Sequence, residues 1–343
     1  MSPFAVTVAG LLGTVLALNV VMTVAIERLD PAQAIAVYKD VDDRRFQKAR
    51  IEVMPRARVA VFGSSRILPL STAAAGLPPG ALFNAGVGAA TVEDYIALWM
   101  RLRKQEKVPD VAVFSVDAWV VDWAQPPARW RSLAGDVTEF LDAHGRGSAE
   151  LWSRSRQAVF LWERAKDLLS YSLLRVTIRD LRQVWRTRTA PDAGVAARLA
   201  EEDYGARWEG QGEEQVRRIA IEYARAGADG LRDFHLDRQR VEWLEALWRD
   251  MRTHQVTVLV YMPPYHPATW ALLQADPRAA QALRWTHDAL GDTARAAGVG
   301  FHDASDPARI PCAESEFYDG RHPKGVCLGR VVKRLLRESG LIE

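Results

Sequence analysis

The sequence predicts an α/β protein with a central parallel sheet that helices cover on both faces. The chain has 343 residues, of which 48% are hydrophobic, enough for one large α/β domain or two small ones. Short apolar runs recur along it, and segments with helical spacing separate them. Short, uniformly apolar runs that alternate with helices are typical of strands buried on both faces of a parallel sheet.

The N-terminal segment is apolar and uncharged, with no Asp, Glu, Lys or Arg before Glu27. As a helix, the 23 residues from Phe4 to Ile26 would extend about 34 Å, enough to cross the hydrocarbon core of a membrane. A cleaved signal peptide is the alternative, but no basic residue precedes the run and no Ala-x-Ala site closes it. We therefore expect a transmembrane anchor over residues 1–26 and a polar, partly helical neck over residues 27–55.

The remaining residues, 56–343, are expected to form the α/β domain. Its strongest strand is the run that Pro263 and Pro264 close, and apolar residues at helical spacing mark the helices. The expected strands are residues 58–63, 82–86, 111–115, 256–262 and 298–302, and the expected helices are residues 92–107, residues 277–297 and the segment after Pro323.

The third and fourth strands are separated by about 140 residues, far more than one crossover needs. Residues 150–185 have helical spacing, residues 129–188 are rich in arginine, and most of the 12 tryptophans lie between the two strands. We expect a helical insertion over about residues 123–250. Its Trp and Arg residues either pack as ordinary helices with a solvated face or form a lid or partner surface.

Polar residues follow the first three strands, at the sheet edge where parallel sheets bind ligands. After the first strand, Gly63-Ser64-Ser65-Arg66 forms a turn that exposes a hydroxyl and backbone N–H groups, although a serine there can equally cap a helix. After the second, the small residues from Asn84 to Ala89 let a ligand approach the backbone closely. Asp117 follows the third strand.

A further polar turn, Asp319-Gly320-Arg321-His322-Pro323, precedes the last helix. A carboxylate three residues before a histidine can bind one imidazole nitrogen and leave the other free as a base. A plain Asp-Gly turn before a helix that starts with proline explains the same residues.

In this order, the motifs resemble those of the SGNH/GDSL hydrolase superfamily. The resemblance covers about residues 58–337 without the insertion and implies a flavodoxin-like three-layer sandwich. It also implies that Ser65 is the nucleophile, His322 the general base and Asp319 the residue that orients it. The anchor, the Gly-Ser-Ser in place of Gly-Asp-Ser and the long insertion are most similar to membrane-anchored envelope members. These are the D-alanyl transfer protein of teichoic acid modification and the alginate O-acetylation proteins.

The resemblance further implies an oxyanion hole formed by the N–H of Ser65, the N–H of Gly88 or Ala89, and the residue at position 117. Ala89 stands where the family has a glycine, and Asp117 stands where it has an asparagine. An asparagine amide donates to an oxyanion, whereas an ionised carboxylate repels it. Either Asp117 is protonated or turned away, with Arg66 assisting, or the enzyme is slow, or the protein is not an enzyme.

Other residues are expected near the site, namely Ser64, Arg66, Asn84, Tyr265 and His266. The last two follow the fourth strand and either line the site or shape its loop. His302-Asp303 is the one candidate metal pair, and the other histidines lack ligand spacing. We therefore expect no metal and no cofactor. The net charge of +2 provides no strong field for nucleic acid, so no nucleic-acid partner is expected.

By its resemblance, the protein is expected to be a membrane-anchored serine esterase or O-acyltransferase that acts on acyl groups of a cell-envelope glycan. The expected partners are an acyl-bearing small molecule or envelope glycan and an integral-membrane acyltransferase. The resemblance also places the domain in the periplasm on a single span of the inner membrane, although the basic residues after the span slightly favour the opposite orientation. The alternative is a non-catalytic envelope scaffold, which Asp117 and Ala89 favour.

The two cysteines, Cys312 and Cys327, flank the Asp319-His322 turn. In an oxidising compartment they can form a disulfide, which requires Cα atoms within about 7 Å of each other. Two buried free thiols are the alternative.

Overall fold

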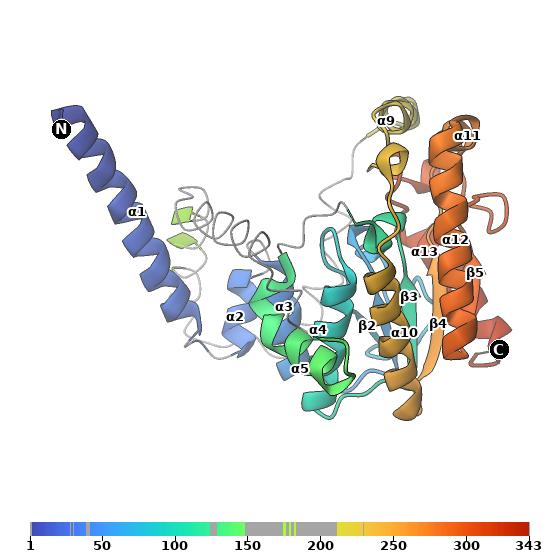
Figure 1. The fold of residues 1–343 in the computed structure, drawn as a ribbon, viewed down its shortest axis with the longest axis horizontal. Helices are drawn as coiled ribbons and strands as arrows, with labels where there is room; N and C mark the ends of the chain where they lie inside the picture. Colours follow the sequence, from blue (N-terminus) through green and yellow to red (C-terminus); the bar gives the residue numbers. More distant parts are fainter. Residues whose placement is uncertain are drawn as a thin grey trace.

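The computed structural model of the chain contains a five-stranded, all-parallel sheet with the strand order β2-β1-β3-β4-β5 (Figure 1). This confirms the predicted α/β class with its parallel sheet. The strands are β1 (Val59–Phe62), β2 (Leu82–Asn84), β3 (Val111–Ser115), β4 (Thr257–Met262) and β5 (Gly300–Asp303). The structure describes residues 2–27, 29, 31–38, 42–123, 129–147, 174–175, 178–179, 182, 211–228 and 230–342.

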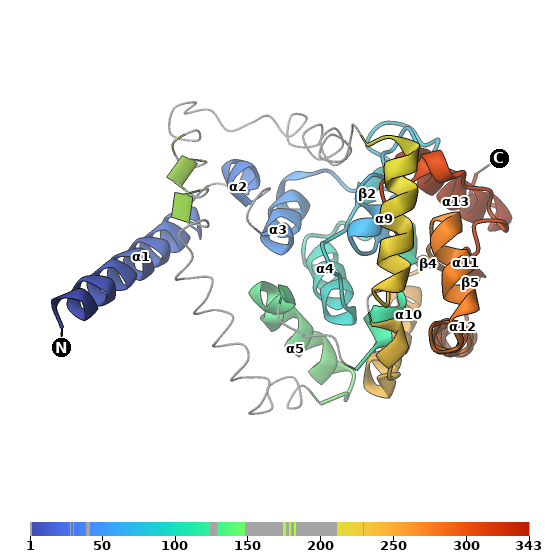
Figure 2. The same cartoon turned by 90° about the horizontal axis from the view of Figure 1, so that it is seen from above.

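Helices cover both faces of the sheet because alternate strand residues face two different cores. Ala60, Phe62 and Phe114 face the core formed with α4 (Val92–Lys104), α10 (Arg238–Thr253) and α12 (Pro277–Ala297). Val61 and Val113 face α13 (Gly325–Glu338) on the other side. Figure 2 shows α4 and α13 on opposite sides of the sheet.

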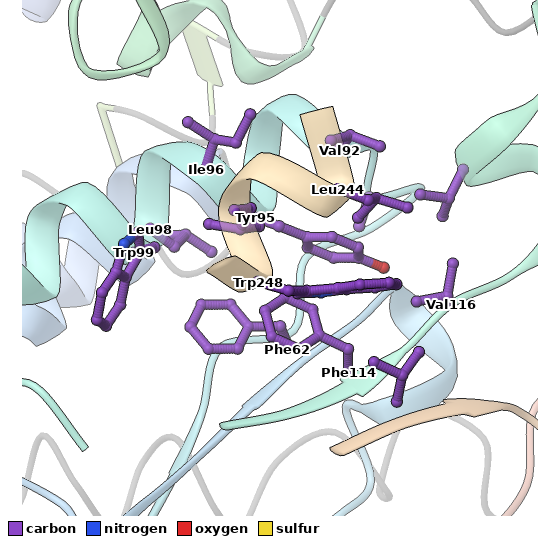
Figure 3. Close-up of a cluster of buried hydrophobic side chains, with 14 of the residues drawn as sticks. Phe62, Val92, Tyr95, Ile96, Leu98, Trp99, Phe114, Val116, Leu244 and Trp248 are labelled. Carbon is purple, nitrogen blue, oxygen red and sulfur yellow. The ribbon is translucent and has the colours of Figure 1, made fainter. Parts of the chain in front are cut away.

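Aromatic side chains form the centre of the larger core (Figure 3). The rings of Phe62 and Phe114 stack with centroids 4.7 Å apart, and Trp248 meets Phe114 edge-on at 6.0 Å. The Tyr95 hydroxyl donates to the carbonyl of Ser115 over 2.9 Å, so its polar group is paired although the ring is buried. This packing fixes the ends of β1 and β3, between which the candidate site lies.

The N-terminal helix α1 (Pro3–Glu27) projects away from the sheet (Figure 1). It is long and apolar enough to cross a membrane, and side chains such as Phe4 and Leu11 are exposed. A helix of this kind is a membrane anchor or a signal sequence. After it, α2 (Pro31–Tyr38) and α3 (Asp43–Val53) pack together around Ile35 and Phe46.

The connection between β3 and β4 is helical in its described parts. The crossover helix α10 covers the sheet, and the buried Trp130, Trp243 and Trp248 belong to the larger core, which is ordinary helix packing. The expected helix over residues 150–185 lies almost wholly outside the described residues. The other elements here are η2 (Ala118–Val121), η3 (Arg129–Leu133), α5 (Ala134–Ala143), α9 (Glu213–Arg225) and η6 (Leu231–Asp233).

A disulfide joins Cys312 to Cys327, with Cα atoms 5.4 Å apart. It ties the loop between β5 and α13 to the first turn of α13. The same end of the sheet carries η1 (Ser65–Ile67), α11 (Pro267–Ala275) and η7 (Glu314–Glu316).

Candidate active site

Three of the predicted site residues form one chain of hydrogen bonds. The Oγ atom of Ser65 lies 2.9 Å from Nε2 of His322, and Nδ1 of His322 lies 2.7 Å from Oδ2 of Asp319. Ser65 is half-buried and His322 is buried. The structure therefore brings together a hydroxyl, an imidazole and a carboxylate, although 257 positions separate the serine from the histidine.

Ser65 lies at the topological switch point of the sheet. From β1 the chain moves outward to β2 and then returns to form β3 on the other side of β1, and ligands bind in parallel sheets at such reversals. Gly63 permits the tight turn that follows β1. A Cβ atom at this position would lie 2.9 Å from Ile67 and 3.0 Å from Ser115.

The Asp319 turn holds both the carboxylate and the imidazole. Oδ1 of Asp319 accepts hydrogen bonds from the backbone N–H groups of Arg321 and His322, each over 2.8 Å. Burial opposes the charge of Asp319, but the hydrogen bonds and the His322 ring outweigh it and lower the pKa of the carboxyl. An ionised carboxylate only accepts, so Nδ1 of His322 carries the proton and Nε2 is left to accept from Ser65.

Asp117, expected at the oxyanion hole, forms a buried ion pair instead. Its Oδ1 accepts from Arg66 over 2.7 Å, and its Oδ2 accepts from the Ser64 hydroxyl over 2.7 Å. Arg66 also donates to the carbonyl of Pro264 and lies 4.5 Å from the centroid of the Tyr265 ring. Both oxygens of Asp117 are acceptors, so it offers no donor to an oxyanion. Ser64 and Arg66 are fully buried behind the site and do not line it.

The two alternatives for the second oxyanion donor differ in their hydrogen bonding. The N–H of Gly88 donates to Oδ2 of Asp43 over 2.8 Å and is therefore already used. Neither the N–H of Ala89 nor that of Ser65 donates to any residue that the structure describes. A bond of 3.1 Å from the Val87 N–H to the Gly63 carbonyl holds this loop beside the Ser65 turn. Ala89 and Ser65 are thus the available donors.

Asn84 supports the serine turn through both ends of its amide. Its Nδ2 donates to the carbonyls of Ile67 and Leu70 over 2.8 Å and 3.0 Å. Its Oδ1 accepts from the N–H of Gly86 over 3.0 Å. The side chain therefore connects the loop after β2 to the η1 turn.

Tyr265 and His266 shape the loop after β4, one of the two roles expected for them. Both are buried, and burial raises the pKa of Tyr265 and lowers that of His266. The backbone N–H of His266 donates to the Gly320 carbonyl over 3.2 Å, and its Nδ1 accepts from the Ala268 N–H over 3.1 Å. His266 thus caps α11 and supports the Asp319 turn.

The candidate metal pair has separate partners. His302 contacts Glu338, with 3.3 Å between Nδ1 and the carboxylate, and Asp303 pairs with Arg309 at 2.9 Å. In the described part of the chain, no group of three or more His, Cys, Asp or Glu side chains could hold a metal ion.

Residues of α3 also reach the site, and sequence reasoning missed them. Arg44 and Gln47 are buried against the loop after β2. The sequence signal for these contacts is a short amphipathic pattern in which polar residues recur every three positions at 44, 47 and 50. A solvated polar neck gives the same pattern, so only the fold distinguishes a buried polar helix face from a solvated one.

A scan of protein-family models finds none that matches this chain, and no curated protein matches it either.

Proposed function

We propose that this protein is a membrane-anchored serine esterase or O-acyltransferase of SGNH type that acts on acyl groups of a cell-envelope glycan. The observation that carries the proposal is the hydrogen-bonded chain from Ser65 through His322 to Asp319. The strand order 2-1-3-4-5 is that of flavodoxin-like sheets and supports the same fold family.

The geometry supports acyl transfer in two half-reactions. In the first, Oγ of Ser65 attacks the acyl carbonyl while Nε2 of His322 takes the hydroxyl proton. The tetrahedral intermediate then collapses, the C–O bond to the leaving alcohol breaks, and His322 returns the proton to that alcohol. In the second, water or an acceptor hydroxyl loses its proton to His322 and attacks the acyl-serine ester. The C–O bond to Ser65 then breaks, and His322 returns the proton to the serine Oγ.

Asp319 and two backbone N–H groups complete this mechanism. The Asp319 carboxylate keeps the proton of the neutral imidazole on Nδ1 and stabilises the imidazolium that forms. The N–H groups of Ser65 and Ala89 stabilise the negative oxygen of the intermediate. Donors fixed before the reaction act strongly because they need no reorganisation as the charge develops.

The helix α1 and the disulfide support a proposed cellular location. We infer that α1 is an uncleaved anchor in the inner membrane and that the domain lies in the periplasm. A Cys312–Cys327 bridge is typical of an oxidising compartment. An alkaline phosphatase fusion after Glu343 tests the topology, because the fused enzyme is active only outside the cytoplasm. A well-expressed but inactive fusion would place the domain inside.

The nucleophile is tested by labelling full-length protein in detergent with a fluorescent fluorophosphonate. We expect wild type to be labelled, Ser65→Ala to lose the label and the matched variant Ser64→Ala to keep it. Turnover of p-nitrophenyl acetate should follow the same order. Absence of both label and turnover in folded wild-type protein would refute the catalytic proposal.

The second candidate function is a non-catalytic envelope scaffold that keeps the fold. Asp117 favours it, since its carboxylate stands where the resemblance assigns an amide donor. This function predicts that Ser65→Ala behaves as wild type in every envelope phenotype, whereas the catalytic one predicts that it behaves as a deletion.

A further inference from the structure

The helix that follows the anchor and α2 holds the loop of the candidate oxyanion hole. Three buried side chains of α3 donate to backbone carbonyls of this loop. Gln47 donates to Gly86 over 2.7 Å, Arg50 donates to Asn84 over 2.9 Å, and Arg44 donates to Gly88 over 2.8 Å. The neck is therefore packed against the loop that carries the candidate donor Ala89.

Arg44 makes the most extensive of these contacts. Its Nε and Nη2 atoms bind the two oxygens of Asp94 over 2.9 Å and 2.8 Å, and its Nη1 donates to the carbonyl of Gly88. Its neighbour Asp43 accepts from the N–H of the same glycine. Since Asp94 also caps α4 through the N–H of Thr91, the guanidinium is fixed on both sides.

The carbonyl that Arg44 binds belongs to the same peptide group as the N–H of Ala89. A trans peptide is planar, and its C=O and N–H point in opposite directions. A guanidinium bound to the Gly88 oxygen therefore turns the Ala89 N–H away from α3. It also polarises the amide, which strengthens the N–H as a donor.

The conformation of Ala89 shows that this loop needs such a restraint. Its φ angle is +48°, in the left-handed region that costs a non-glycine residue about 1–2 kcal/mol. A flip of the Gly88–Ala89 peptide would relax the backbone and withdraw the N–H. The hydrogen bond from Arg44 to the Gly88 carbonyl opposes that flip, and the bond from the Gly88 N–H to Asp43 holds the preceding peptide group in place.

We propose that Arg44 is a positioning residue for acyl chemistry at Ser65, because it holds the Ala89 N–H in place to receive the oxyanion. This inference rests on the proposed function. It makes the neck part of the catalytic apparatus. The position of α3 is in turn supported by α2 and by Met22 of the anchor helix, which pack in the cluster that contains Phe46.

The test measures kcat for p-nitrophenyl acetate per active site in full-length protein in detergent, with sites counted by fluorophosphonate labelling to completion. We expect Arg44→Gln to lower kcat per site by about 10- to 100-fold, which is at most the cost of about 10²- to 10³-fold for losing one oxyanion donor outright. KM should change little, because the donor acts on the transition state. Arg44→Lys keeps the charge but not the planar fork, so its kcat per site should also fall, by about tenfold.

The matched control is Arg45→Gln on the same helix, where Arg45 packs over the Tyr38 ring and pairs with Asp42. We expect it to keep the wild-type kcat. A merely structural role for Arg44 would reduce the number of labelled sites and leave kcat per site unchanged, which would overturn the inference. If Arg44→Gln does not fold, Arg44→Lys decides by the same criterion. Wild type without label or turnover would instead overturn the proposed function itself.

Discussion

The substitution Asp319→Asn tests whether Asp319 determines which ring nitrogen of His322 carries the proton. The amide oxygen of Asn can keep the two backbone hydrogen bonds that Oδ1 of Asp319 accepts from Arg321 and His322, each of 2.8 Å. The amide NH₂ then faces Nδ1 of His322 at the position of Oδ2. It donates to Nδ1 and forces the ring proton onto Nε2, which can then no longer accept from Ser65.

The expected magnitude follows from this change of tautomer. Where an Asp-His pair is converted in this way, kcat falls by about 10⁴-fold, which corresponds to about 5.4 kcal/mol in the activation free energy. KM should stay within about threefold, because Asp319 contributes to the base and not to substrate binding.

The assay is p-nitrophenyl acetate turnover under saturating substrate, normalised to the folded protein. Asp288→Asn is the matched control, since Asp288 contacts His287 over 3.1 Å on the exposed surface of α12. The control should keep wild-type activity. A kcat for Asp319→Asn within about threefold of wild type would remove Asp319 from the mechanism, because tautomer control is worth far more.

The same variant has a pH signature in stability. The pKa of Asp319 is lowered from 3.8, so in the acid range the unfolded chain binds a proton more readily than the folded one. The carboxylate therefore stabilises the fold above the unfolded pKa, and this stabilisation is lost as the pH falls through the folded pKa. In urea denaturation, the free energy of unfolding should fall less steeply below about pH 4 for Asp319→Asn than for wild type.

Three further outcomes are expected. Ser64→Ala should keep the fluorophosphonate label on Ser65, and loss of the label would assign the nucleophile to Ser64. The same variant should lower the free energy of unfolding by about 1–3 kcal/mol, because the buried carboxylate of Asp117 loses the Ser64 hydroxyl as a donor. Replacing Cys312 and Cys327 by serine should lower the free energy of unfolding by about 3 kcal/mol, and unchanged urea midpoints would contradict this. Burial lowers the pKa of His266 from 6.5, so the unfolded state takes up the proton first and stability should fall as the pH drops below about 6.5. His266→Asn keeps a helix cap and should flatten that fall, whereas an unaltered pH profile would exclude this histidine as its source.

Much of the fold could be predicted because the central strands β1 and β3 are buried at every residue and β4 is buried at all but its first. Such strands appear as uniformly apolar runs, and all five begin within the expected segments. The candidate catalytic residues could also be predicted, because each lies in a short polar motif at a strand end or before a helix. The sequence could not decide between a disulfide and two free thiols, since the spacing of Cys312 and Cys327 does not fix the distance between them.

The hydrogen-bond partners of the oxyanion loop could not be predicted in the same way. Nothing local distinguishes the N–H of Gly88 from that of Ala89, and the deciding acceptor, Asp43, lies 45 positions earlier in the chain. Arg44 shows the same limit, because a buried arginine and a solvated one look identical in sequence. Only the packing of α3 on the loop after β2 separates them.

Asp117 stands where the resemblance assigns an oxyanion donor, but its contacts are those of a structural ion pair. With Arg66 it forms a fully buried ion pair that joins the end of β3 to the serine turn, and Arg66 extends the connection to Pro264 after β4. The carboxylate therefore balances the charge of Arg66 within this buried connection, and under the proposed mechanism two backbone N–H groups would stabilise the oxyanion.

Restoring the amide that the resemblance assigns should therefore not restore a donor. In Asp117→Asn the Arg66 charge loses its partner, and breaking a buried pair from one side costs about 3–5 kcal/mol. The new amide would still be held by Arg66 and Ser64, which lie 2.7 Å from the present oxygens. We expect a lower urea midpoint and no rise in kcat per labelled site, with Asp288→Asn as the control for loss of a surface carboxylate. A folded Asp117→Asn protein that turns over tenfold faster would show that the carboxylate suppresses the oxyanion hole and that two backbone donors do not suffice.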